Sequence, residues 1–143
     1  MYYLKLVLLL TLTSTVATAG TLRPIFIRAS CEGKSSSAAL SSLKEEITAS
    51  QKYELARSLY DEGRMDIVLM IYMSCVERHD VIAVATNYGL AKCYSEHNCH
   101  LSVDGNSIRS TLCDTSVAEC GHMLFNALND YLSHPSAIPF KLN

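Results

Sequence analysis

Apolar side chains recur at helical intervals along most of the chain, and this pattern predicts an all-α fold. Leu40, Leu43 and Ile47 have the i, i+3, i+7 spacing of one helical face. A second helix is expected over residues 50–62, because apolar positions continue there and Gly63 is a suitable C-terminal stop.

Two further segments are assigned to helices with less support from periodicity. Residues 67–73 are apolar on every face, which fits either a buried strand or a central helix, since periodicity does not separate the two. Helical patterns on both sides favour a helix over residues 67–77. A fourth helix is expected over residues 81–96, with Asp80 as its N-cap.

The last helix has the clearest start signal in the chain. Ser116 and Glu119 form a capping-box pattern ahead of a continuous apolar stripe, which ends at His134-Pro135. Upstream of it, a turn sequence at residues 104–106 predicts a miniature hairpin. We therefore expect a small disulfide-stabilised bundle of four or five helices.

The N-terminus has the three parts of a secretory signal peptide. Lys5 precedes an apolar stretch at residues 6–12, and small residues at Ala17 and Ala19 mark a cleavage site after Ala19. This stretch is too short to cross a bilayer of about 30 Å, and no later segment approaches the roughly 20 apolar residues that a spanning helix needs. We expect a secreted protein with no membrane span.

The chain is expected to have four parts. Residues 1–19 are the signal peptide, and residues 20–34 are an extended N-terminal arm with β character at residues 25–27. Residues 35–134 form the disulfide-stabilised helical domain, and residues 135–143 form a flexible tail.

Charge excludes two classes of partner. Signal cleavage removes one of the 12 basic residues and none of the 14 acidic ones, so the formal charge moves from −2 to −3. No basic run is present, which argues against nucleic acid or anionic lipid headgroups as partners.

The six cysteines all follow the signal peptide, and an even number in an oxidising compartment indicates three disulfides. Six cysteines allow 15 pairings. If the last two helices form an antiparallel hairpin, the residue numbers of two facing positions add up to a nearly constant value. This favours two nested disulfides (a ladder) between the last four cysteines, and the first two cysteines then pair by default. The expected pairs are Cys99–Cys113, Cys93–Cys120 and Cys31–Cys75.

Candidate chemistry is sparse, and we expect neither an enzyme nor a bound metal or cofactor. His79-Asp80 follows Cys75 by four residues, as in secreted phospholipases A2, but the flanking cysteines and the calcium loop of those enzymes are missing. The cysteines and histidines at residues 93–100 do not have the spacing of a common zinc module.

Elimination leaves binding as the expected function. The Cys99–Cys113 loop and the N-terminal arm are expected to be exposed and tethered, so they lose little conformational entropy when a partner binds. We predict an extracellular or cell-surface protein as the partner, as for an effector, a toxin or a signalling ligand. The alternative is a carrier of a small hydrophobic ligand, and the oligomeric state stays open. The predicted contacts are His100, Leu101, Val103, Asp104, Asn106, Ile108 and Arg109.

Overall fold

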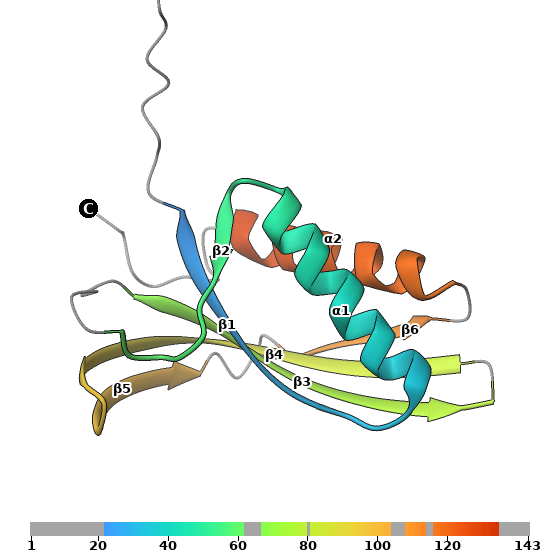
Figure 1. Ribbon diagram of the computed structural model, residues 1–143, viewed down its shortest axis with the longest axis horizontal. Helices are drawn as coiled ribbons and strands as arrows, with labels where there is room; N and C mark the ends of the chain where they lie inside the picture. The colour runs from blue at the N-terminus through green and yellow to red at the C-terminus, as the bar shows by residue number, and fades with distance from the viewer. Residues whose placement is uncertain (1–21, 62–66, 80, 104–107, 114–115, 135–143) are drawn as a thin grey trace, which may run out of the picture.

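The computed structural model describes residues 22–61, 67–79, 81–103, 108–113 and 116–134 (Figure 1). These residues form a six-stranded mixed sheet with two helices, so the prediction of an all-α bundle is wrong. In chain order the elements are β1 (Arg23–Cys31), α1 (Lys34–Ala49), β2 (Tyr53–Leu55), β3 (Val68–Arg78), β4 (Val81–Ser95), β5 (Asn98–Val103), β6 (Arg109–Cys113) and α2 (Val117–Ser133).

The sheet has the strand order β2-β1-β3-β4-β5, and β6 also pairs with β4. β1 is parallel to both β2 and β3, whereas β3 and β4 form a long antiparallel hairpin. At the tip of this hairpin His79 has a φ of 55°, the left-handed conformation that tight hairpin turns require. Residue 80, the expected helix cap, lies outside the described residues.

β5 and β6 lie end to end along the same edge of β4. Val103 at the end of β5 faces Gly89, and Arg109 at the start of β6 faces Thr86. Both strands are antiparallel to β4, so they do not pair with each other as the predicted miniature hairpin requires. Residues 104–108 therefore separate two pieces of what is otherwise one strand.

Both helices cover the same face of the sheet, and the main core lies between these two layers (Figure 1). Its centre is formed by Tyr88 on β4, which is 1 % exposed and stacks on Tyr131 of α2 with ring centroids 4.4 Å apart. Side chains from β1, β3 and both helices complete it. These include Ile25, Leu43, Ile47, Ile71, Leu124 and Leu128.

The two observed helices are those with the clearest sequence signals. The Ser116 hydroxyl accepts a hydrogen bond from the Glu119 N–H at 3.3 Å, as the capping box predicts. α1 has no side-chain cap of its own; the Glu77 carboxylate of β3 accepts hydrogen bonds from the Ser35 and Ser36 N–H groups at 3.1 and 3.3 Å. A distant strand residue thus supplies the missing cap.

The helices approach each other most closely at Gly121 of α2. A Cβ at this position would overlap the Ser42 Oγ and would lie 2.5 Å from the Ser42 Cβ and 2.9 Å from the Leu43 backbone nitrogen. Glycine is therefore required here by the space between the helices.

Three predicted helices are replaced by strands or irregular chain. Within residues 50–61, the part of this segment that the structure describes, the one regular element is the short strand β2, and the two predicted segments that follow form β3 and β4. The buried positions of β4 alternate regularly, as at Ile82 and Val84, but the outward positions that alternate with them, such as Ala83 and Ala85, are also apolar and hide this pattern. β3 is central and flanked by strands on both sides, so its apolar run is that of a buried strand.

The predicted N-terminal arm is part of the sheet. Its β character is present in β1, but β1 lies between β2 and β3, and Ile25 is 0 % exposed. The expectation that this arm is exposed is therefore wrong for the middle of the segment. The predicted signal peptide and flexible tail lie outside the described residues.

Candidate functional site

The structure contains three disulfides, but it pairs four of the cysteines differently from the expected ladder. Cys93 lies directly opposite Cys99 in the β4–β5 ladder, so a strand hairpin brings together two cysteines that helices would have kept apart. The nested pairs Cys99–Cys113 and Cys93–Cys120 are wrong. The observed bonds are Cys31–Cys75, Cys93–Cys99 and Cys113–Cys120.

Each disulfide fixes a different junction of the fold. Cys31–Cys75 joins β1 to β3, and Cys93–Cys99 holds the start of β5 against β4. Cys113–Cys120 joins the end of β6 to the first turn of α2, with both residues 0 % exposed. The segment between the second and third bonds is thereby anchored at both ends.

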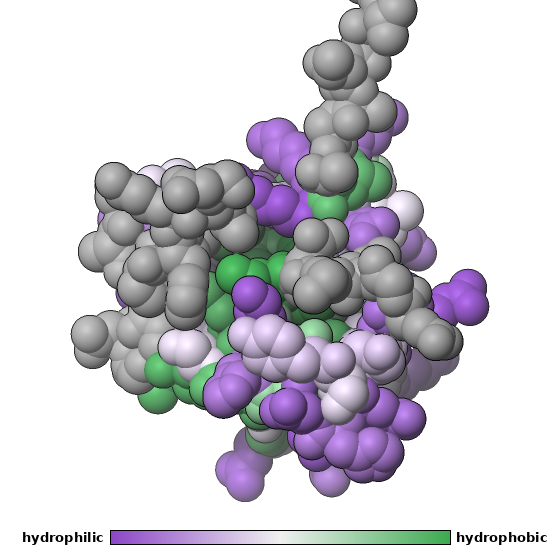
Figure 2. Space-filling model, turned by 90° about the vertical axis from the view of Figure 1, so that its left-hand side faces the viewer, coloured by the Kyte–Doolittle hydropathy of each residue, from purple (hydrophilic) through white to green (hydrophobic). Residues whose placement is uncertain are grey.

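The face of the sheet opposite the helices, here called the open face, carries apolar side chains that no described element covers. Among the described residues, Ala56 and Leu59 pack against one end of this face, where they contact Val68, Met70 and Ala91. Figure 2 views the molecule from the left-hand end of Figure 1, with the open face along its lower side, and shows apolar surface among polar side chains at this end.

The five predicted contact residues that the structure describes are all exposed. Leu101 and Val103 are 52 % and 50 % exposed and lie on the open face, beside Ala91 and Gly89. Ile108 is 64 % exposed and lines a pocket on the same face.

The other predicted contacts do not all share that face. His100 alternates with Leu101 along β5, and Arg109 with Ile108 at the start of β6, so both face the helix side of the sheet. There the His100 ring contacts the Tyr94 ring edge-on, with the ring centroids 5.9 Å apart. Asp104 and Asn106 lie outside the described residues.

Several open-face residues were missed by the sequence reasoning because their positions depend on the strand register. Val76 on β3, Val81 on β4 and Leu112 on β6 are 56 %, 39 % and 66 % exposed. Val76 and Leu112 flank Ala83 in the ladder, so they lie in one row across the strands. The alternation of buried and exposed residues along β4 would have identified this row had the segment been assigned to a strand.

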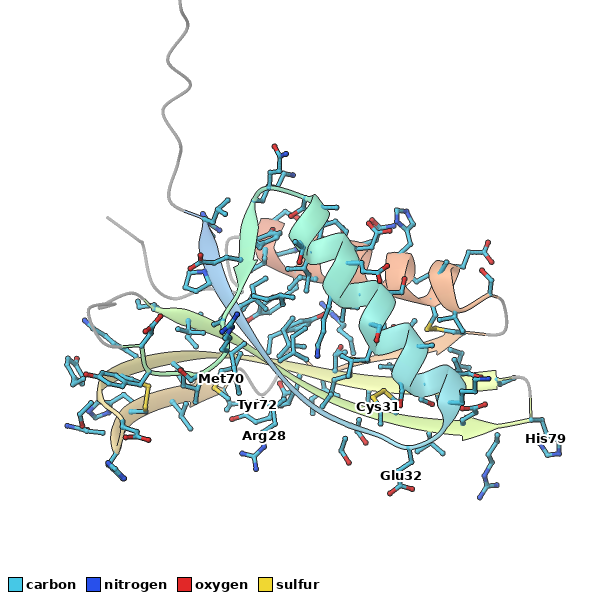
Figure 3. All side chains as sticks on the ribbon, viewed as in Figure 1. Arg28, Cys31, Glu32, Met70, Tyr72 and His79 are labelled. Atoms are coloured by element: carbon cyan, nitrogen blue, oxygen red, sulfur yellow. A yellow bond between two sulfur atoms is a disulfide. The ribbon has the colours of Figure 1, made fainter. Side chains whose placement is uncertain are left out.

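A pocket of about 380 Å³ lies in the middle of the open face. Its floor is a row of small side chains from three neighbouring strands, Ser30, Ser74 and Ala85, which the ladder places side by side. Arg28 and Tyr72 form the next row and give the pocket a taller wall. Figure 3 shows both side chains on the side of the sheet away from the helices.

The charged residues at the described strand positions of the open face are two arginines, Arg28 and Arg78, and one carboxylate, Glu54 on the edge strand β2. Among the described residues that line the pocket, Arg28 is the one charged side chain. Glu32, one residue beyond β1, points to the same side (Figure 3). No described carboxylate lies within salt-bridge distance of Arg28. Its guanidinium is therefore available to an external anion.

The described residues offer no constellation for acid–base or metal chemistry. Three or more histidine, cysteine, aspartate or glutamate side chains do not converge anywhere among them, and Cys93 and Cys99 are consumed in a disulfide. Burial raises the pKa of Tyr88, so this phenol stays neutral within the core. His79 lies at the exposed tip of the β3–β4 hairpin (Figure 3).

Taken together, these features define a disulfide-linked two-layer α+β domain with an open sheet face. No protein-family model matches the sequence, and no curated protein is significantly similar to it. None of the helices in the described part of the chain is long and apolar enough to cross a membrane.

Proposed function

We propose that the protein is secreted and acts outside the cell by binding a protein partner through the open face, beside β5 and β6. The observation that carries this proposal is the distribution of exposed apolar side chains. Among the described residues, six of the nine large apolar side chains that are exposed lie on this face. They are Val76, Val81, Leu101, Val103, Ile108 and Leu112.

Such a concentration is unusual for a surface that faces only water. Contiguous apolar patches on soluble proteins are typical of interaction sites. Covering apolar surface stabilises a complex by about 25 cal/mol per Å² before the costs of association are subtracted. The disulfides at Cys99 and Cys113 tether the two strands that carry much of this surface, which reduces the ordering cost.

The three disulfides and the signal-like N-terminus support an extracellular site of action. The alternative function, a carrier of a small hydrophobic ligand, is favoured by the open-face pocket. However, a sheet face encloses a ligand from one side, whereas small-molecule sites usually bury at least 70 % of their ligand. Protein binding is therefore the better-supported proposal.

The test measures binding of the labelled, disulfide-bonded protein to a panel of intact cells before and after treatment of the cells with a surface protease. We expect saturable, protease-sensitive binding that unlabelled wild-type protein competes. The double variant Leu101→Asp/Leu112→Asp should fail to compete. Because aspartate also lowers strand stability, Leu112→Ser serves as a milder variant, and circular dichroism verifies that both are folded.

Met123→Asp on α2 is the matched control, since Met123 is also an exposed apolar residue, at 42 %, but lies on the helical layer. It should compete as well as the wild type. Equal competition by the open-face and helix-face variants, or the absence of saturable protease-sensitive binding, would overturn the proposal.

A further inference from the structure

We propose that the open-face pocket recognises a short acidic peptide segment of the partner, with a carboxylate bound to Arg28 and an adjacent apolar side chain placed over Ser30, Ser74 and Ala85. This inference rests on the proposed function, because it names the chemistry of the partner that the same face binds.

The floor and the rim of the pocket have different chemistry. Small side chains at Ser30, Ser74 and Ala85 leave the backbone of three strands open to close approach. On the rim, Tyr72 and Ile108 provide apolar contacts, and Arg28 provides a cation. A segment that combines an apolar and an anionic side chain matches this arrangement.

The spacing between the rows of large side chains on either side of Ser30, Ser74 and Ala85 favours an extended segment over a helix. The row of Arg28 and Tyr72 and the row of Val76 and Leu112 are four residues apart along the strands, a distance of about 13 Å at 3.3 Å per residue. The side chains of both rows occupy part of that distance. An α-helix with its side chains is about 10–12 Å wide and would rest on the walls, whereas an extended chain reaches the floor.

Charge complementarity selects an acidic segment. Because Arg28 is the one charged side chain among the described residues that line the pocket, an acidic ligand meets no like charge from this lining. Arginine also presents a planar fork of donors that fits a carboxylate in a bidentate manner. An apolar side chain beside that carboxylate excludes water, which strengthens the ion pair.

The experiment uses a displayed library of random 12-residue peptides, selected against the wild-type protein with its disulfides intact. Enriched sequences should contain Asp or Glu next to an apolar residue. Synthetic versions are then titrated by fluorescence anisotropy. Arg28→Ala should weaken binding about tenfold or more, as expected for loss of a charge-assisted hydrogen-bonded pair. Ser74→Phe should fill the pocket and abolish binding, and circular dichroism establishes that this exposed substitution leaves the fold intact.

Arg78→Ala is the control, because it removes the same charge from the same face at a residue that does not line the pocket. It should change affinity by less than about twofold. Replacing the peptide's carboxylate by an amide should weaken binding to the wild type but have little further effect on the Arg28→Ala variant, as a direct pair requires.

Three results would overturn the inference: enrichment of peptides without acidic residues, equal losses from Arg28→Ala and Arg78→Ala, or unchanged binding by Ser74→Phe. Palmitate that binds the pocket, together with a selection that yields no peptide, would also overturn it and would support the carrier function. If Arg28→Ala still competes fully for the cell surface, this inference fails while the proposed function stands. If the wild-type protein shows no saturable, protease-sensitive binding to cells, the proposed function itself is refuted.

Discussion

Replacing Gly121 by alanine tests the close contact between the two helices. In an isolated helix the change should stabilise by about 1 kcal/mol, because glycine is the poorer helix former. In the folded protein the new methyl group overlaps Ser42 and reaches the Leu43 backbone nitrogen at 2.9 Å, so the helices must separate. Overpacking of this kind costs about 1–3 kcal/mol, and contact with backbone places the cost at the upper end. The net expectation is a loss of about 2 kcal/mol.

Urea denaturation of the oxidised protein, followed by far-ultraviolet circular dichroism, measures this loss. With a slope of about 2 kcal/mol per M, the midpoint should fall by roughly 1 M. Asn126→Ala is the control, because Asn126 is exposed on the same helix and its replacement should raise stability by up to about 0.5 kcal/mol.

A second variant isolates the contact itself. Ser42→Gly removes two of the three atoms closest to the new methyl group, so Gly121→Ala should cost at least about 1 kcal/mol less in that background. If Gly121→Ala stabilises the protein as Asn126→Ala does, or costs the same in both backgrounds, the close helix–helix packing described above is refuted.

The remaining predictions concern the acid stability and the disulfides. Hydrogen bonds from the Ser35 hydroxyl and from the Ser35 and Ser36 N–H groups lower the pKa of Glu77. The ionised Glu77 carboxylate therefore stabilises the fold fully above its unfolded pKa of about 4.5. This stabilisation is lost as the pH falls through the lower pKa of the folded state. Glu77→Gln should therefore reduce stability at pH 7 and flatten the decline between pH 5 and pH 3; an unchanged acid profile in urea titrations would contradict the capping role. Replacing both members of Cys31–Cys75 by serine should cost about 4 kcal/mol, against about 2.5 kcal/mol for Cys113–Cys120, because the first bond closes the longer loop. The reverse order in urea midpoints would show that local packing outweighs loop entropy, and peptide mapping of the oxidised protein checks the pairings directly.

The parts of the fold that sequence reasoning identified are those with local determinants. The apolar stripe of α1 and the Ser116 cap of α2 depend on residues a few positions apart, and both helices are present. The pattern of β4 does not indicate a strand, because Ala83 and Ala85 on its open face are apolar, like the buried Val84 between them. The cap of α1 by Glu77 joins residues more than 40 positions apart and has no local signal.

The candidate site was predictable to a similar degree. The sequence predicts exposed contact residues near the turn between Cys99 and Cys113. Among these, the structure shows that Leu101, Val103 and Ile108 are exposed. Val76 and Leu112 join them only through the register of β3, β4 and β6, which periodicity does not provide. The disulfide ladder failed for the same reason, since it assumed a helical hairpin where the chain forms strands.

The break between β5 and β6 has a consequence for how this domain can vary over evolution. Each strand holds its own register on β4, and each is pinned at its outer end by a separate disulfide. Residues gained or lost between positions 103 and 109 would therefore leave both ladders in place. Changes in the length or sequence of that segment are therefore expected to be tolerated more readily than changes within either strand.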